Sequence, residues 1–288
     1  MTQHPRSGRH CGTLLLSTLL LFGGCGGQDD ADQIVQKMPA KQESPPLSKT
    51  HAPEPGPAAP PPTEPASSPQ PEARGSGTIV GRILFDAEAP QRQPLTVSKD
   101  TAVCGQTEKF SESLLVGPDK GIKNAVVFLR DVAGGKQFPT SQSQSGHPTI
   151  DQTGCVYDPH VLLVQAGATV DIKNSDGILH NIHTYSEQNP AFNMAQPKFQ
   201  KVISKTFDQP EIIRVTCDVH AWMTAWLVVQ DHPYYALTDE TGAFQLTDVP
   251  SGEYTLKVWH EELGEQTIAL TVTAGQEAPV EITLARAG

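Results

Sequence analysis

The sequence predicts an all-β protein of β-sandwich or Greek-key architecture. After residue 76, short runs rich in Val, Ile and Thr alternate with Gly, Pro, Asn and Asp. No stretch has the apolar repeat of an amphipathic helix over three turns. Residues 76–288 can form one large or two modest domains. The predicted strands lie within residues 77–86, 122–131, 160–176, 211–220, 224–231, 242–261, 266–275 and 278–287.

Residues 1–24 have the features of an export signal. Arg6 and Arg9 supply positive charge, and an apolar run from Leu14 to Phe22 follows, too short for a membrane-spanning helix of the mature chain. The segment "LFGGC" resembles a bacterial lipoprotein signal, although Phe22 stands where Leu is usual. This resemblance implies that Cys25 is acylated as the first mature residue. We therefore expect a lipid-anchored protein on the periplasmic side of a bacterial membrane, or a secreted protein if Cys25 is not acylated.

Residues 25–76 are polar and dense in proline, as in "PEPGPAAPPPTEP". This composition cannot bury enough apolar surface to offset the entropy of ordering, so we expect a disordered, extended tether. Removal of residues 1–24 changes the formal charge from −11 to −13, because Arg6 and Arg9 are lost and no acidic residue is. An acidic chain argues against nucleic-acid binding and leaves a protein partner possible.

The five cysteines divide according to position along an exported chain. Cys11 leaves with the signal and Cys25 carries the lipid, so three cysteines remain in an oxidising compartment. Because three is odd, one thiol has no disulfide partner. Cys217 is the candidate for that thiol, since it alone has neighbours that use a free thiolate. Cys104 and Cys155 are then predicted to form a disulfide, and the other pairings stay open.

The segment "CDVHAWM", from Cys217 to Met223, places a thiol, an imidazole and a thioether within seven positions. A Cys–His nucleophile gives the thioether no role, and oxidation outside the cytoplasm threatens a reactive thiol. Metal ligation explains more, because a thiolate, imidazoles and a weak thioether together stabilise both oxidation states of copper. A second imidazole must come from elsewhere, and "NSDGILHNIH", residues 174–183, offers two at the end of a predicted strand.

The two segments together resemble the cupredoxins, the small blue-copper proteins, and most of all their amicyanin group. That group pairs an Asn-led turn ending in His-Asn-Val-His with a Cys-x2-His-x2-Met loop, and both spacings occur here. The resemblance covers residues 121–230 and implies a Greek-key cupredoxin sandwich. It departs at Ala221 and Trp222, where the group has Pro and Phe, so it does not define the stiffness of the loop.

The resemblance implies one type 1 copper ion. Its ligands would be His180, Cys217, His220 and Met223, the last as the long axial thioether. Asn181 would lie beside the ligands and tie their two loops together. His183 is expected at the surface without metal. In the family the second His ligand presents its ring edge at an apolar surface, so redox partners are expected to dock near His220.

The sequence argues against a copper enzyme. Multicopper oxidases and copper nitrite reductases need further histidines, commonly as His-x-His pairs, and the ten histidines include no such pair. Binuclear oxidase-type centres need two cysteines in the ligand loop, and this loop has one. A single closed site leaves no open position for substrate. We therefore expect an electron carrier; the alternative is a structural module for copper handling or adhesion whose metal does not cycle.

Residues 231–288 predict a second, smaller sandwich. Their run "TDETGAFQLTDVPSGEYTLKV" resembles the carboxypeptidase regulatory-like, transthyretin-like modules, which carry no chemistry of their own. We expect positive φ angles at Gly242 and Gly252 in two turns. The residues predicted to face inward are Phe244, Leu246, Tyr254, Leu256 and Val258. Residues 231–288 are few for such a module, so residues 77–120 are predicted to complete it or to cap the cupredoxin-like sandwich. The two-part chain also resembles lipoproteins of the methylamine-utilisation type, from which we infer no reaction.

Overall fold

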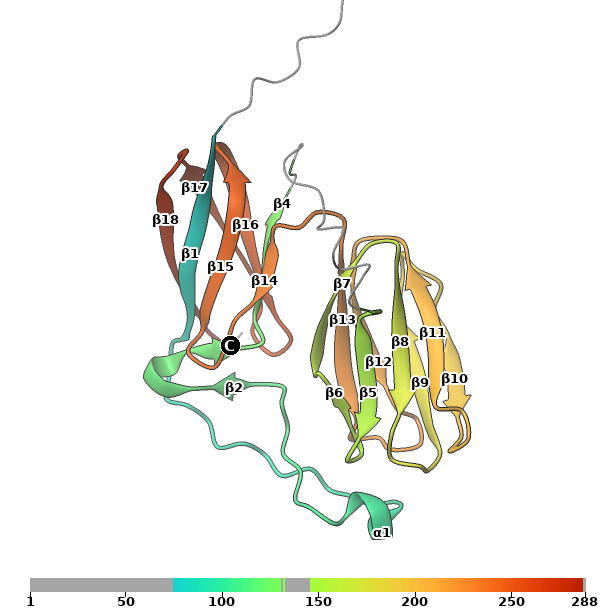
Figure 1. Ribbon diagram of the computed structural model, residues 1–288. Coiled ribbons are helices and arrows are strands. Elements are labelled where there is room, and N and C mark those ends of the chain that lie inside the picture. The colour runs from blue at the N-terminus through green and yellow to red at the C-terminus, as the bar shows by residue number, and fades with distance from the viewer. Residues whose placement is uncertain (1–74, 131, 133–145, 287–288) are drawn as a thin grey trace, which may run out of the picture. The chain divides into compact units, whose positions relative to one another are not determined.

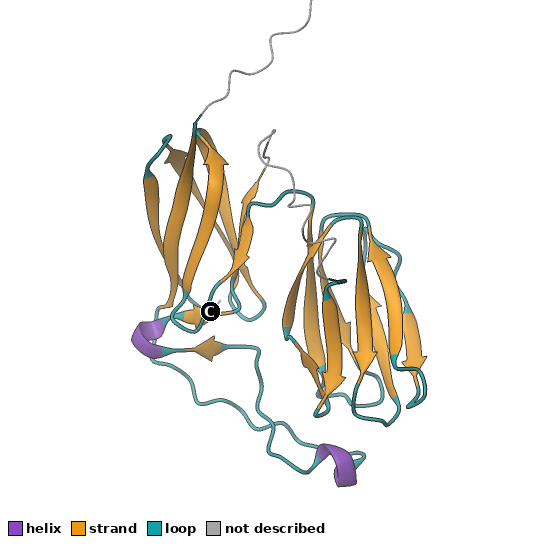
Figure 2. Cartoon of the chain, in the orientation of Figure 1, coloured by secondary structure: helices purple, strands orange, loops and turns teal. Residues whose placement is uncertain are grey.

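The computed structural model describes residues 75–130, 132 and 146–286, and strands dominate this part of the chain (Figure 1, Figure 2). The strands form two β-sandwiches, which confirms the all-β prediction. The predicted signal at residues 1–24, the lipid-carrying Cys25 and nearly all of the predicted tether at 25–76 lie outside the described residues. No helix among the described residues is long and apolar enough to cross a membrane.

One sandwich takes its strands from both ends of the described chain, and we call it the split sandwich. Its first sheet has the order β15-β1-β18, in which β1 is antiparallel to β15 and parallel to β18. Its second sheet has the order β14-β4-β16-β17. The strands are β1 (Ser76–Phe85), β4 (Val126–Arg130), β14 (Tyr235–Leu237), β15 (Ala243–Pro250), β16 (Gly252–His260), β17 (Gly264–Val272) and β18 (Glu277–Leu284).

Strand β1 shows why the far N-terminal part of the described chain belongs to this sandwich. Its sequence SGTIVGRILF buries Ile79, Ile83 and Phe85 in the apolar core that the later strands also line. A Cβ atom at Gly81 would come within 2.3 Å of the Val280 carbonyl oxygen, so only glycine lets β1 and β18 approach this closely. Strand β1 therefore completes the split sandwich, one of the two alternatives predicted for residues 77–120.

The other sandwich is inserted between β4 and β14 of the first, and we call it the inserted sandwich. Its sheets have the orders β10-β9-β12-β13-β7 and β11-β8-β5-β6, so the chain crosses repeatedly between them. The strands are β5 (Thr149–Thr153), β6 (Val156–Asp158), β7 (Val161–Gln165), β8 (Ala168–Asn174), β9 (His180–Tyr185), β10 (Asn193–Gln196), β11 (Val202–Phe207), β12 (Glu211–Thr216) and β13 (Thr224–Gln230).

The structure corrects the predicted boundary between the two sandwiches. Residues 121–230 are expected to form one domain, but β4, within residues 121–130, pairs with β14 and β16 of the split sandwich. The apolar run "AVVFLR" suits any sheet buried on both faces, so its pattern does not show which sandwich it joins. Residues 231–288 likewise form only part of a sandwich, because β1 and β4 are also needed.

The predicted turns of the split sandwich are half right. Gly242 has φ of 77°, and a Cβ atom there would come within 2.3 Å of the Ile83 carbonyl oxygen. The prediction for Gly252 is wrong, because its φ is not positive; the nearby positive φ, 57°, belongs to Asp248 inside β15, where the register with β1 shifts. Aspartate tolerates the left-handed region better than most residues, so Asp248 can take the positive φ in place of Gly252. The predicted inward row is buried except for Tyr254, which is half-buried.

The chain between β1 and β3 contains the only α-helix of the described residues. We call residues 86–114 the cap segment. Within it lies α1 (Thr101–Cys104), whose Cys104 forms a disulfide with Cys155 of the inserted sandwich. This is the pairing that the sequence favours. After the cap segment, β2 (Leu115–Val116) and β3 (Ile122–Lys123) pair around η1 (Pro118–Lys120) and lead into β4.

Candidate metal centre

Three predicted ligands meet at one end of the inserted sandwich. His180 is the first residue of β9, and Cys217 follows the last residue of β12. Because these two strands are antiparallel neighbours, the start of one and the end of the other lie at the same end of the sheet. His220 lies in the loop that joins β12 to β13. The two sequence motifs are therefore brought together by strand pairing.

The three side chains direct their donor atoms at one another. The Sγ atom of Cys217 is 3.9 Å from Nδ1 of His180 and 3.8 Å from Nδ1 of His220, and the two Nδ1 atoms are 2.9 Å apart. Both rings are 0% exposed and Cys217 is 1% exposed. Two atoms bound to one metal ion at about 2.0–2.3 Å can lie no further apart than about 4.5 Å. All three distances meet this limit, so this donor set fits a single metal ion.

The loop from Cys217 to Met223 closes on itself through its backbone. The Met223 N–H donates to the His220 carbonyl at 2.9 Å, and the Cys217 N–H donates to the Met223 carbonyl at 3.2 Å. Met223 is 1% exposed and belongs to the same core cluster as Cys217. The structure thus places the predicted axial residue in the buried loop, and its thioether as a ligand stays a prediction.

Asn181 joins the two ligand-bearing segments, as the resemblance implies. Its side-chain oxygen accepts hydrogen bonds from the backbone N–H groups of Asp218 at 2.6 Å and Val219 at 3.1 Å. Its amide nitrogen donates to the Asn193 side chain at 2.7 Å. Because these bonds fix the loop that follows Cys217 against β9, the positions of the donor atoms are set before any metal binds.

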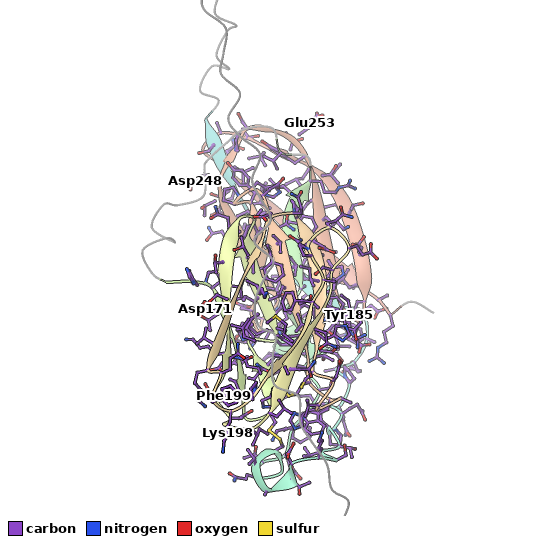
Figure 3. All side chains as sticks on the ribbon, turned by 90° about the vertical axis from the view of Figure 1, so that its right-hand side faces the viewer. Asp171, Tyr185, Lys198, Phe199, Asp248 and Glu253 are labelled. Atoms are coloured by element: carbon purple, nitrogen blue, oxygen red, sulfur yellow. A yellow bond between two sulfur atoms is a disulfide. The ribbon has the colours of Figure 1, made fainter. Side chains whose placement is uncertain are left out.

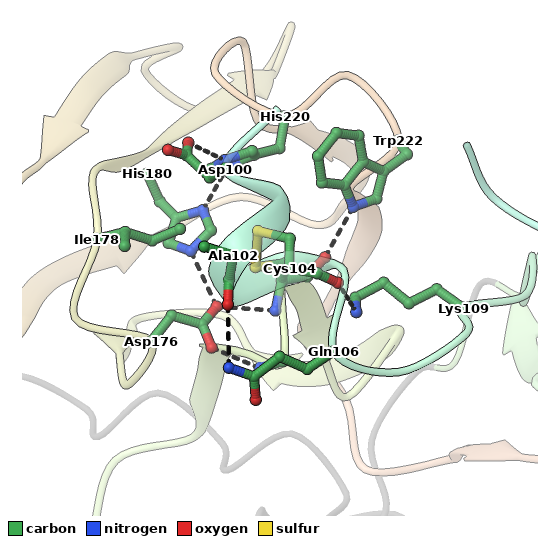
Figure 4. Close-up of a disulfide and its surroundings, with 12 residues drawn as sticks. Asp100, Ala102, Cys104, Gln106, Lys109, Asp176, Ile178, His180, His220 and Trp222 are labelled. Carbon is green, nitrogen blue, oxygen red and sulfur yellow. Dashed lines mark hydrogen bonds and ion pairs between the residues drawn. A yellow bond between two sulfur atoms is a disulfide. The ribbon is translucent and has the colours of Figure 1, made fainter. Parts of the chain in front are cut away.

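A carboxylate lies at the outer nitrogen of each imidazole (Figure 4). Nε2 of His180 is 2.9 Å from the Asp176 carboxylate, and Nε2 of His220 is 2.8 Å from the Asp100 carboxylate. An N–H donated outward at Nε2 leaves the lone pair of Nδ1 for a metal, and carboxylates commonly hold ligand histidines in this way. The geometry therefore orients both rings with Nδ1 toward Cys217.

Burial and neighbouring groups shift the pKa values of all three donors. Burial alone lowers the pKa of His180, but Asp176 and the Cys217 thiol outweigh burial and raise that pKa to about 9. Burial raises the pKa of Cys217, yet the contact with His180 and backbone N–H groups, including that of Asn181, lowers it overall. Burial and the nearby His180 lower the pKa of His220 despite its bond with Asp100. A metal that binds Nδ1 of His180 therefore has to displace a proton from this imidazole near neutral pH.

Sequence reasoning missed both carboxylates. Asp176 lies four residues before His180 inside the quoted motif, so its spacing could have revealed it. Asp100 lies 120 residues from His220, in a segment with no motif, and no signal in the sequence connects them. His183, by contrast, lies outside the cluster as expected, since its Nδ1 contacts Asp218 at 3.1 Å.

The structure also corrects the expected exposure of His220. The family resemblance implies a ring edge at an apolar surface, but the ring is completely buried. Asp100 lies at its outer nitrogen, and the Trp222 ring contacts it with a centroid distance of 5.0 Å. The reason is the cap segment, which the Cys104–Cys155 disulfide holds beside the ligand loop. The motif that carries the resemblance contains no part of this segment.

Comparisons with known proteins find both predicted resemblances. Residues 225–285 match the family model of the carboxypeptidase regulatory-like domain. Among solved structures, the chain is similar to a methionine-to-alanine mutant of amicyanin in its Cu(I) form, with 20% identity over 36% of this chain and 98% of the other, at a TM-score of 0.28. It is also similar to a purple cupredoxin from Nitrosopumilus maritimus, with 20% identity over 29% of this chain and 99% of the other, at a TM-score of 0.25. No curated protein matches the chain in sequence. At these TM-scores the structural matches add no weight to the site, whose geometry carries the case for a metal.

Proposed function

We propose that this chain is a mononuclear blue-copper electron carrier. The observation that carries the proposal is the buried trio of one thiol and two imidazoles, whose donor atoms lie within 3.9 Å of one another. A soft thiolate with two imidazoles in one plane is the donor set of type 1 copper, and Met223 is proposed as the axial ligand. One copper ion per chain is proposed.

Copper in such a site supplies a one-electron exchange between Cu(I) and Cu(II). The residues of this chain keep the donor atoms in place during that exchange. Asp176 and Asp100 hold the outer nitrogens of the imidazoles, and Asn181 holds the ligand loop against β9. Complete burial of both rings excludes water from the donor atoms. Because the donor side chains have to move little when the charge on the metal changes, electron transfer is proposed to be fast. No position for a substrate is proposed.

A redox protein is proposed as the partner, docking at the ligand end of the inserted sandwich. Two exposed apolar side chains support this position: Leu179, directly before His180, is 46% exposed, and Phe199 is 82% exposed. Their loops meet at Asn174, which donates to the Ile178 and Gln196 carbonyls. Figure 3 labels Phe199 beside Lys198 on the loop after β10. Such small apolar contacts suit brief redox encounters.

The proposed location is the periplasmic side of a bacterial membrane. It rests on the signal-like residues 1–24 and on acylation of Cys25 or, failing that, secretion. Mass analysis of the mature chain from a bacterial host tests it. A diacylglyceryl group on an N-terminal Cys25 is expected, and an unprocessed N-terminus contradicts export.

A copper-handling or adhesion module is the second candidate, because the split sandwich adds a second domain in which no group of three possible metal ligands lies among the described residues. Voltammetry of the copper-loaded full chain separates the two functions. A carrier gives one reversible one-electron wave whose peak separation stays constant as the scan rate rises. An irreversible wave, or copper that leaves on reduction, contradicts the carrier and favours copper handling.

A further inference from the structure

The cap segment is held firmly although it belongs to neither sandwich. Its two arms pair with each other: Leu95 N–H donates to the Lys109 carbonyl and Ser111 N–H to the Gln93 carbonyl, both at 2.8 Å. Lys109 is 7% exposed, and its ammonium donates to the Cys104 carbonyl, which closes the loop around α1. The Cys104–Cys155 disulfide then joins this closed loop to the inserted sandwich. The segment thus acts as a rigid carrier for the residues of α1 and its start.

Asp100 sits at the start of α1 in an unusual way. At this position an aspartate normally accepts a hydrogen bond from a backbone N–H of the helix, but the Asp100 side chain makes no such bond. Its backbone is also left-handed, with φ of 48°, which carries a steric cost for any residue except glycine. The carboxylate instead lies 2.8 Å from Nε2 of His220. The local structure therefore forgoes a helix cap and tolerates a strained backbone where the side chain meets His220.

The contact with His220 mirrors the one on the other imidazole. Asp176 meets His180 within the inserted sandwich itself, whereas the cap segment delivers Asp100 from 120 residues away. His220 is completely buried, and the Asp100 side chain is 39% exposed. A molecule approaching the outer edge of His220 therefore meets a carboxylate and the start of α1.

We propose that Asp100 is a positioning residue of the metal centre: it fixes the His220 ring with Nδ1 inward and closes the ring edge that would otherwise reach the surface. The proposal rests on the proposed function, since the centre is taken to hold copper. It adds that the inserted sandwich is incomplete as a metal site without the disulfide-held cap segment.

Two substitutions separate the charge of Asp100 from its hydrogen bond. Asp100→Asn keeps an acceptor oxygen, removes the charge and tolerates the left-handed backbone; Asp100→Gly removes the side chain without adding backbone strain. The control is Asp119→Asn on η1, which also has a positive φ, 52°, and leaves His220 untouched. In the full chain, Zn(II) affinity measured against a chromophoric chelator is expected to fall about 10–100-fold for Asp100→Gly. A smaller fall is expected for Asp100→Asn, and none for Asp119→Asn.

A second readout needs no metal. In the metal-free full chain labelled at histidine, the Nε2–H proton of His220 is expected to be protected from exchange in the wild type and in Asp100→Asn, and to exchange rapidly in Asp100→Gly. Zn(II) affinity within twofold of wild type in Asp100→Gly, together with unchanged exchange, overturns the positioning role. If Asp100→Gly does not fold, rapid exchange of the His220 ring proton in the wild type overturns the positioning role. A wild type that forms no copper chromophore while the ring proton behaves as expected refutes the copper carrier and leaves the positioning of His220 intact.

Discussion

The two sandwiches of this chain bury different kinds of residue. The core of the split sandwich is almost entirely aliphatic and aromatic, and its buried polar side chains among the described residues are Thr238 and His260. The inserted sandwich and its cap segment bury many more: Lys109, Gln152, His160, Asn174, His180, Asn181, Thr184, Asn189, Gln196, His220 and Gln230. Burial of an unpaired polar group costs free energy. A region that buries many polar side chains is therefore a candidate for a functional site.

The difference teaches where chemistry can reside in such a chain. Thr238 of the split sandwich is fully satisfied by the backbone, since it donates to the Ile122 carbonyl at 2.6 Å and accepts from the Ala125 N–H at 2.9 Å. The donor atoms of the metal centre, in contrast, mainly contact one another. The Thr238 hydroxyl only stabilises the fold, whereas the donor atoms of the metal centre have lone pairs that a metal can bind.

Removal of the disulfide should have the largest effect, because the loop that it closes contains β4 of the split sandwich as well as β5 of the inserted sandwich. The double variant Cys104→Ser, Cys155→Ser frees a crosslink that spans 51 residues. From loop entropy we expect the free energy of unfolding to fall by about 4 kcal/mol. Urea denaturation of the metal-free full chain, followed by circular dichroism, measures this. Thr101→Ser on the same helix is the control, and a loss of less than about 1 kcal/mol in the double variant would show that the cap segment is held by other contacts.

Acid should destabilise the split sandwich through one residue. Burial lowers the pKa of His260 to about 4, against the attraction of Glu261 and Glu262. Because an unfolded histidine titrates near pH 6.5, the unfolded state binds the proton first, and stability is lost as the pH falls from about 6.5 to about 4, by roughly 3 kcal/mol in total. Urea midpoints measured across this range should fall in the wild type.

The variant His260→Gln should flatten this dependence, and the exposed control His147→Gln should keep it. Equal slopes in wild type and His260→Gln would mean that His260 is protonated in the folded protein, which would contradict its assignment as a buried neutral side chain.

Loss of Asn181 should have the smallest effect on stability. Asn181→Ala leaves the backbone N–H groups of Asp218 and Val219 without their acceptor. We expect a loss of about 1–3 kcal/mol in the free energy of unfolding, because two partly buried N–H groups lose their acceptor. Thermal unfolding of the metal-free chain measures it. The matched control is Asn193→Ala, which removes one partner of Asn181 and spares both N–H groups. Equal losses in the two variants would contradict the role of Asn181 in holding the ligand loop.

The sequence predicts the metal centre better than it predicts the fold around it. His180, Cys217 and His220 lie in two short motifs at strand ends, and strand pairing brings such ends together wherever the rest of the sheet lies. The sequence assigned β4 to the wrong sandwich, since the residues of an apolar strand do not show which sheet the strand joins. Asp100 was missed because its place depends on the disulfide and on the closed loop of the cap segment, neither of which has a local pattern.

The positive φ at Asp248 was missed for a related reason. Both Asp248 and Gly252 suit a tight turn, and the sequence favours the glycine because it has no steric cost. Strand pairing decides otherwise, since β16 begins at Gly252 and the register shift between β1 and β15 falls at Asp248. Local propensity yields to pairing along the whole strand.

The most direct test of the central claim is a visible and EPR spectrum of the full chain after addition of Cu(II), with the variant Cys217→Ser beside it. The account predicts an intense thiolate-to-copper charge-transfer band and a narrow copper hyperfine splitting in the wild type, both absent from the variant. A colourless wild type, or a spectrum that does not change when Cys217 is replaced, would contradict the blue-copper centre.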